Sequence, residues 1–224
     1  MSAKHKLNTR TLAVCAMLCA MAFALTAVSH FLLPPLLPGA AWLKYDPKDV
    51  ILAITALMLG PVPALLVTLV ASLLEMLTFS ETGWIGLVMN VVASGAFILP
   101  GALLYSRRRT LQSAVIGLLC GVAFMTGVML LWNAFLTPLY MGVPREAVIG
   151  MLVPVFLPFT AIKGGLNAAV TLFVYKPLTR ALRAANLLPA QTSEKKKSVT
   201  GITILIAAAI AAVCVLVLLL LRRG

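Results

Sequence analysis

The sequence has 224 residues, of which 62% are hydrophobic and only 11% are charged, and its formal net charge is +12. Soluble domains are about half apolar and about a quarter charged, so this composition excludes them and indicates an integral membrane protein. The positive charge could suggest nucleic-acid binding, but Lys and Arg lie at the ends of apolar segments and form no basic stripe interleaved with aromatics. We therefore expect a lipid bilayer, and no nucleic acid, as the surroundings of this chain.

The apolar segments have about 20 residues each, the length that an α-helix needs to cross a bilayer, and they lack the alternation of outer-membrane strands. The predicted fold class is all-α, a polytopic membrane helical bundle. The four cysteines lie inside predicted helices without a pairing or ligand pattern, so we interpret them as small apolar residues and expect no metal site.

The first predicted helix covers residues 11–33 and follows a basic N-terminal segment. With about 23 residues it is longer than the apolar core of a signal peptide, so it is predicted to be retained. Along this helix alanine recurs at every fourth position, at Ala16, Ala20 and Ala24. Such a small-residue stripe allows another helix to approach closely, although alanine-rich runs also arise by chance.

A non-helical segment is predicted at residues 34–47, where prolines and glycine interrupt the apolar pattern. Its last part, residues 43–49, holds four charges and a tyrosine. A helix-capping turn needs only one aspartate, Asp46 or Asp49, so this density of polar groups favours a further role.

Two short helices follow, at residues 49–60 and 63–78, with the break Gly-Pro-Val-Pro at 60–63 between them. Short helices that are broken by Pro and Gly often line binding sites in transporters. Glu75, near the end of the second helix, could reach the preceding loop or remain exposed.

The next two helices are predicted at residues 83–105 and 111–136, and they carry Asn90 and Asn133. An asparagine inside a membrane helix can hydrogen-bond a neighbouring helix at modest gain, so packing and ligand binding both stay open for these residues.

Lys163 lies near the middle of the apolar run 148–174. A cation at that depth costs several kcal/mol, so such residues usually face a bundle interior, a cavity or a ligand. Thr160, Lys163 and Asn167 share one helix face, which we interpret as the wall of a substrate pocket. A lysine that reaches toward the interface, or a buried ion pair, is the alternative.

The remaining sequence divides the chain into a substrate-binding membrane domain of six helices at residues 1–188, a basic linker at 189–200 and an additional transmembrane helix at 201–224. Most Lys and Arg residues of the short loops fall on the side of the N-terminus, which predicts a cytoplasmic N-terminus. No phosphate-binding loop and no common hydrolase motif occurs, so we expect neither ATP hydrolysis nor another catalytic activity.

Several of these pieces together resemble the substrate-binding (S) components of energy-coupling factor (ECF) transporters, and within them the riboflavin-specific type. The resemblance covers about residues 6–188. It rests on Leu-Lys-Tyr-Asp-Pro-Lys-Asp-Val at 43–50, Gly-Pro at 60–61, Trp-Asn at 132–133, Pro-Leu-Tyr at 138–140 and Pro-Phe-Thr-Ala-Ile-Lys-Gly at 158–164.

The resemblance implies a subunit of a bacterial plasma-membrane importer that captures riboflavin from outside. Such subunits work with a separate transmembrane coupling protein and two ATPases, and they carry no cofactor of their own. It further implies that the alanine stripe of the first helix docks on the coupling protein and that the loop containing Leu43 and Lys44 packs over the ligand. The candidate substrate-binding residues are Leu43, Lys44, Asp46, Asn90, Asn133, Thr160, Lys163 and Asn167.

Two features depart from the family pattern. Thr160 stands where the riboflavin type usually has asparagine, for which Asn167 could compensate, and residues 202–221 have no counterpart in a six-helix bundle. One alternative is an S component for another planar vitamin or its precursor. A second is a membrane-embedded enzyme acting on a lipid or isoprenoid, with Asp46, Asp49 and Glu75 as acid–base or Mg²⁺-binding groups. A structural subunit without a ligand would leave Lys163 and Asn133 unexplained.

Overall fold

The computed structural model describes residues 9–36, 43–80, 82–107, 110–184 and 200–223. Within these ranges the chain is an all-α membrane protein without strands, which confirms the predicted fold class. The predicted linker at 189–200 lies outside the described residues except for Thr200, where the last helix begins.

The long helices begin and end within two residues of their predicted positions, except for the helix that carries Lys163. They are α1 (Thr9–Leu32), α2 (Lys48–Leu59), α3 (Pro61–Thr78), α4 (Gly83–Arg107), α5 (Leu111–Phe135), α8 (Leu157–Ala184) and α9 (Thr200–Arg223). Gly60, which separates α2 from α3, has φ 95°, a conformation that favours glycine and allows the sharp reversal there.

The segment between α5 and α8 is more helical than predicted. It contains α6 (Thr137–Met141), α7 (Arg145–Met151) and the π-helical turn η1 (Leu152–Phe156), which leads directly into α8. Pro154 lies inside this turn. A proline lacks the N–H and crowds the carbonyl four residues earlier, so the wider π-turn is a way to continue the helix across it.

Among the described residues, five helical stretches are long and apolar enough to cross a membrane: α1, α3, α4, α5 and the continuous run 145–181. The apolar part of α9, Ile204–Leu219, is shorter. With 12 residues α2 is about 18 Å long, too short for a hydrocarbon core of about 30 Å, and every residue in it except Met58 is buried. It therefore forms the centre of the bundle, where it contacts α1, α3, α4 and α8.

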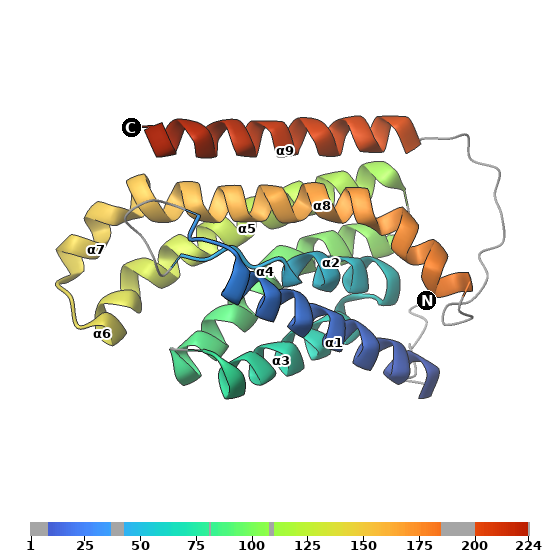
Figure 1. The fold of residues 1–224 in the computed structure, drawn as a ribbon, viewed down its shortest axis with the longest axis horizontal. Helices are drawn as coiled ribbons and strands as arrows, with labels where there is room; N and C mark the ends of the chain where they lie inside the picture. The colour runs from blue at the N-terminus through green and yellow to red at the C-terminus, as the bar shows by residue number, and fades with distance from the viewer. Residues whose placement is uncertain (1–8, 37–42, 81, 108–109, 185–199, 224) are drawn as a thin grey trace.

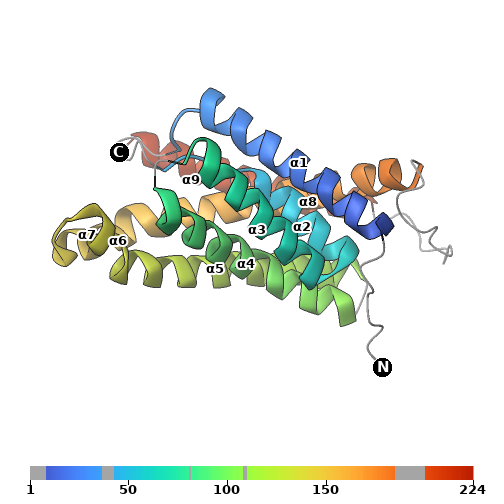
Figure 2. The same ribbon diagram turned by 90° about the horizontal axis from the view of Figure 1, so that it is seen from below.

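The helices are arranged in layers around α2 (Figure 1). In this view α1 and α3 lie on one side of the bundle, while α9 lies on the opposite side and runs alongside α8, which it contacts (Figure 1). The view from below shows α4 and α5 side by side (Figure 2). These two helices approach closely at Gly121, which has no Cβ atom. A Cβ atom there would lie 2.1 Å from the carbonyl oxygen of Phe97.

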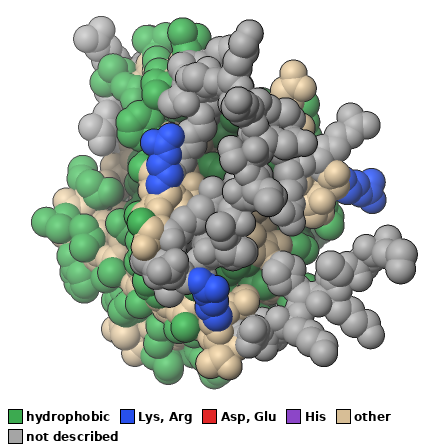
Figure 3. Space-filling view, turned by 90° about the vertical axis from the view of Figure 1, so that its right-hand side faces the viewer, with side chains coloured by type: hydrophobic (Ala, Val, Ile, Leu, Met, Phe, Trp, Pro, Cys, Tyr) green, Lys and Arg blue, Asp and Glu red, His purple; other side chains and the backbone are tan. Residues whose placement is uncertain are grey.

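One end of the bundle carries exposed basic side chains. Arg10, Arg107 and Arg180 lie exposed at the end where α1 begins and where α4 and α8 end. Figure 3 looks onto this end, where the described charged side chains in view are Lys or Arg and none is acidic. The described residues thus place basic side chains at one end, as the loop sequences predicted.

Candidate functional site

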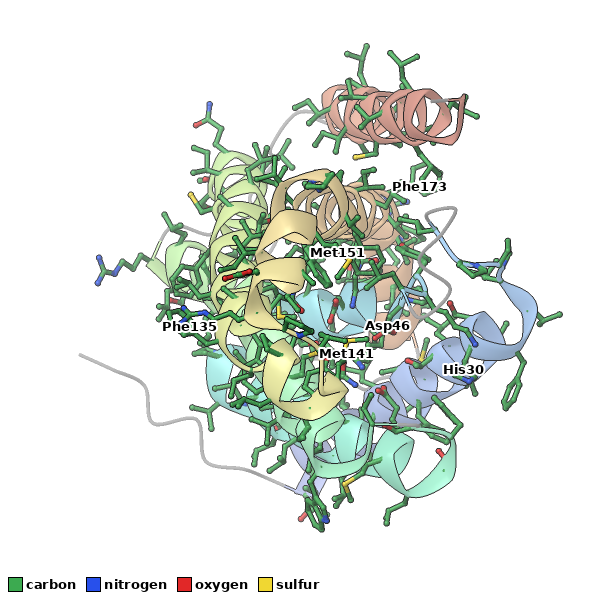
Figure 4. All side chains as sticks on the ribbon, turned by 90° about the vertical axis from the view of Figure 1, so that its left-hand side faces the viewer. His30, Asp46, Phe135, Met141, Met151 and Phe173 are labelled. Carbon is green, nitrogen blue, oxygen red and sulfur yellow. The ribbon has the colours of Figure 1, made fainter. Side chains whose placement is uncertain are left out.

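The candidate site lies toward the other end of the bundle, at the α1–α2 loop, of which the structure describes residues 33–36 and 43–47. Residues 43–47 lead directly into α2. Figure 4 looks onto this end. In this projection Asp46 lies near the centre, with His30 of α1 to one side and with Met141 and Met151, from α6 and α7, beside it.

Asp46 joins the loop to two helices. Its Oδ1 accepts a hydrogen bond from Thr26 Oγ1 of α1 at 3.1 Å and one from the backbone N–H of Lys48 at 3.2 Å. The second bond satisfies the free backbone N–H of Lys48, the first residue of α2. The N-cap position itself is occupied by Pro47, which forms no side-chain cap bond, so neither aspartate caps α2 in the predicted way. Asp49 instead accepts a hydrogen bond from Ser94 Oγ of α4 at 2.5 Å.

Lys48 is completely buried, although the sequence singled out only the charge density around it. Its Nζ lies 2.8 Å from Asp46 Oδ2 and 2.6 Å from Glu75 Oε2. Asn90 Nδ2 donates to the same Glu75 oxygen at 3.1 Å. Glu75 therefore reaches the residues next to the loop, the first of its two predicted alternatives, and Asn90 is held by Glu75.

Lys163 faces the same group of carboxylates. Its Nζ lies 3.8 Å from Asp46 Oδ2 and 3.7 Å from Asp49 Oδ2. Charge-assisted hydrogen bonds of this type are about 2.7–2.9 Å long, so these carboxylates attract the ammonium group without using its N–H donors fully. The Lys163 side chain is 13% exposed, and no described residue lies within an ideal hydrogen-bond distance of its Nζ, so its N–H donors keep capacity for a ligand.

Asn167, one turn further along α8, is completely buried and uses its amide within the protein. Its Oδ1 accepts a hydrogen bond from the Tyr45 hydroxyl at 2.6 Å. Its Nδ2 donates to the backbone oxygen of Asp46 at 3.1 Å and to Asp49 Oδ2 at 3.3 Å. In this structure Asn167 thus ties α8 to the loop and to α2. The charged side chains around the loop and Asn167 form one group, which we name the interior polar cluster: Asp46, Lys48, Asp49, Glu75, Lys163 and Asn167.

Leu43 and Lys44 leave the loop in different directions. Leu43 packs against an apolar group formed by Leu36 of the loop with Phe159 and Ile162 of α8, which neighbour Thr160 and Lys163 in the sequence. Lys44 Nζ donates to the backbone oxygen of His30 at the end of α1, at 3.4 Å. The loop is therefore held against α8 by an apolar contact and against α1 by a polar one.

Thr160 and Asn133 are buried but bond mainly to their own helices. Thr160 Oγ1 donates to the backbone oxygen of Phe156 at 2.8 Å. Asn133 Nδ2 donates to the backbone oxygen of Met129 at 2.7 Å, and its Oδ1 accepts from Thr137 Oγ1 at 2.8 Å. Thr160 retains an acceptor, and Asn133 retains one N–H and one lone pair, so both keep capacity for a ligand.

Trp132, next to Asn133, carries a buried indole N–H that has no hydrogen-bond partner among the described residues. An unpaired buried donor costs about 1–3 kcal/mol, so a polar atom of a ligand or a water molecule is the expected partner. In the sequence Trp132 stands out only as part of a family motif, which does not indicate this donor.

The surroundings of Asp46 and Tyr45 in the loop fix their protonation states. Burial alone would raise the pKa of Asp46, but Lys48 and Lys163 favour its carboxylate and lower the pKa to about 2. Burial, together with the neighbouring Asp49 and Asp46, raises the pKa of Tyr45 above its usual value. At neutral pH Asp46 is therefore ionised, and Tyr45 keeps the proton that it donates to Asn167.

The chain matches a known protein family over most of its length. A family model described as the ECF transporter, substrate-specific component, matches residues 10–175, which is most of the chain. The chain belongs to this family. The riboflavin transporter RibU of Staphylococcus aureus (strain TCH60) is 32% identical to this substrate-specific component over 192 residues, which cover 82% of the chain and 99% of that protein.

Two further comparisons agree. The riboflavin transporter FmnP of Bacillus subtilis (strain 168) is 28% identical over 193 residues, which cover 81% of the chain and all of that protein. A solved structure described as the S component of a bacterial ECF transporter superposes with a TM-score of 0.65 and 31% identity. The match covers 78% of this substrate-specific component and 98% of that chain, so nearly the whole of the known structure has a counterpart in this one.

The family assignment confirms that the protein is a multi-pass membrane transport component and not an enzyme. The geometry agrees, because the carboxylates proposed for the enzyme alternative, Asp46, Asp49 and Glu75, lie against two lysines. In the described part of the chain, no group of three or more His, Cys, Asp or Glu residues is placed to hold a metal ion.

Proposed function

We propose that this substrate-specific component captures riboflavin from outside the cell for an ATP-driven ECF importer. The observation that carries the proposal is the similarity to proteins named as riboflavin transporters, which extends over nearly their whole length. The site chemistry supports it. Isoalloxazine presents an edge of carbonyl oxygens with one N–H, which suits the donors of Lys163 and the amide of Asn133. Its flat apolar faces suit walls of Leu, Phe and Trp side chains.

The proposed site residues either contact the flavin directly or hold the contacting residues in place. Lys163, Asn133 and Thr160 would contact its polar edge, and Leu43 with Lys44 would cover it from the loop. Asp46, Asn90 and Asn167 would act by holding these groups in place, because their own polar atoms bond within the interior polar cluster.

The test of this function is a riboflavin titration of the detergent-purified protein, read by quenching of tryptophan fluorescence, after its visible absorption spectrum has been recorded. Yellow flavin that copurifies, or saturable quenching at one site per chain, is the expected result. A colourless protein that does not respond to riboflavin would contradict the proposal. In that case other planar vitamins and their precursors would be titrated next, and Thr160 would be the first residue to substitute.

The proposed assembly includes a transmembrane coupling protein and two ATPases, in the plasma membrane of a bacterium. The exposed basic end of the bundle would face the cytoplasm together with the N-terminus, following the excess of Lys and Arg there. We retain the division into a binding domain at 1–188, a linker at 189–200 and an additional helix at 201–224 as part of this proposal.

The docking surface for the coupling protein is proposed on α1. Ala16, Ala20 and Ala24 are all exposed, and α1 lies on the opposite side of the bundle from α9 (Figure 1). A bulky side chain in this stripe would hold a partner helix away.

Ala20→Leu is therefore expected to leave riboflavin binding unchanged and to abolish uptake. Binding is measured on the purified protein, and uptake in cells that also produce the coupling protein and ATPases. The matched control is Ala208→Leu, which adds the same atoms at an exposed alanine of α9. Normal uptake by cells carrying Ala20→Leu would exclude the alanine stripe as the docking surface.

A further inference from the structure

The last helix, α9, is the part of this protein that the family does not explain. The family model ends at residue 175, and 82% of the chain is enough to cover 99% of the Staphylococcus aureus relative. Nevertheless α9 packs along α8, the helix that carries Lys163, and Ala207 of α9 is buried in the main core of the bundle (Figure 1).

The contact between α8 and α9 is close at Gly165. A Cβ atom on this residue would lie 2.5 Å from the Sγ of Cys214, so a larger residue would require Cys214 to move. Its neighbour Gly164 faces α5 instead, where a Cβ atom would lie 2.9 Å from Met125 Cε. The two glycines therefore serve different helices, and the one at 165 receives α9.

From this contact α9 reaches the α1–α2 loop. Buried Leu36, Phe159 and Ile162 form an apolar group that we name the loop cluster. Leu43 and Tyr45 of the loop pack against the loop cluster, and so do Cys214 and Leu218 of α9. Side chains of the loop, of α8 and of α9 thus share one packed group.

The loop cluster adjoins the interior polar cluster through Tyr45. Its ring packs in the apolar group, while its hydroxyl donates to Asn167, one turn from Lys163. Leu36 also donates its backbone N–H to the oxygen of Leu43, which closes the two ends of the loop on each other. The described residues of the loop are otherwise held by hydrogen bonds and by the ion pairs of Asp46, so loss of the apolar support would loosen the part around Leu36 and Leu43.

We propose that α9 braces the ligand-binding loop: by packing on Gly165 and the loop cluster, it holds the α1–α2 loop against α8 and slows the release of ligand. The part that concerns the ligand rests on the proposed function, whereas the part that concerns the loop does not. The ligand is therefore expected to stay bound longer than it would without α9, although α9 adds no contact with the ligand itself. The helix thereby contributes to binding from outside the six-helix binding domain.

Two pairs of adjacent residues in α9 provide matched variants of the full chain. Cys214→Phe places a large ring in the contact with Gly165, and Val213→Phe places the same ring on an exposed position. Leu218→Ala removes an apolar contact with the loop cluster, and Leu219→Ala makes the same change at an exposed position. The milder Leu218→Ala keeps the test decisive if Cys214→Phe does not fold.

The first measurement needs no ligand. Hydrogen–deuterium exchange of the Leu36 amide, which reports opening of the loop, is expected to become about tenfold faster in Cys214→Phe and Leu218→Ala. The two control variants are expected to exchange like the unaltered protein. Equal exchange in all five proteins would overturn the brace.

The second measurement is the rate of riboflavin release from the same proteins. We expect the release rate to be about tenfold higher in the two test variants, because a loop without its brace opens more often. The association rate is expected to stay unchanged, since the variants alter none of the residues proposed to contact the ligand. Faster exchange of the Leu36 amide with unchanged release would overturn the effect on the ligand. If the unaltered protein bound no riboflavin, the proposed function would fail, and the exchange measurement would still decide whether α9 braces the loop.

Discussion

Replacing Lys163 with methionine is expected to weaken riboflavin binding by about 1.5–3 kcal/mol, the usual contribution of a hydrogen bond to a charged group, or roughly tenfold to a hundredfold in Kd. The N–H donors of Lys163 are incompletely used by Asp46 and Asp49, so their main partner is expected to be the ligand. The Kd of the variant is measured by tryptophan quenching and its stability by thermal unfolding.

Folding should survive this substitution because both carboxylates retain other partners. Asp46 keeps Lys48 at 2.8 Å, and Asp49 keeps its hydrogen bonds from Ser94 and Asn167. Arg180→Met is the control, since it removes a positive charge from the exposed basic end. An unchanged Kd in Lys163→Met would remove Lys163 from the binding site, whatever the ligand is.

The positions of the helices could be predicted because their signals are local. The break between α2 and α3 coincides with Gly60, whose positive φ requires the residue type that the sequence places there. The π-turn at Leu152–Phe156 was missed, because a proline inside a long apolar run predicts an interruption but does not specify how the backbone accommodates it.

The candidate site could be predicted only in part, because its contacts join remote segments. Lys163 was singled out by the cost of a charge in the membrane, but its carboxylate neighbours, Asp46 and Asp49, come from the other end of the binding domain. Likewise the bond between Tyr45 and Asn167 spans 122 positions in the sequence. No periodicity or spacing reports which distant side chains will meet.

The same limit applies to Lys48 and to α9. Lys48 occurs in a loop-like segment where a lysine is expected to be solvated, and its burial depends on Glu75, 27 residues later. The sequence of α9 is apolar on all sides, so it does not indicate which face packs on α8. The contact of Cys214 with Gly165 and the burial of Ala207 identify that face in the structure.

Replacing Lys48 with methionine is expected to cause the largest loss of stability, about 3–5 kcal/mol, as for other buried ion pairs that lose one partner. Lys48 is completely buried between Asp46 and Glu75, so its removal leaves two carboxylates in the bundle interior with fewer compensating donors. The measurement is thermal unfolding of the detergent-purified protein. Arg107→Met, which removes an exposed positive charge, is expected to have little effect.

A double-mutant cycle separates the ion pair from the packing of the lysine stem. Glu75→Gln neutralises the carboxylate and keeps its shape, so it should lose less stability than Lys48→Met. The double variant should be more stable than the sum of the two losses predicts, because the neutral amide no longer needs the ammonium group. Additive losses would mean that Lys48 is not coupled to Glu75 and stabilises the bundle through Asp46 or through the packing of its stem. The interior polar cluster would then hold the loop through Asp46 and Asn167 without the contribution of Glu75.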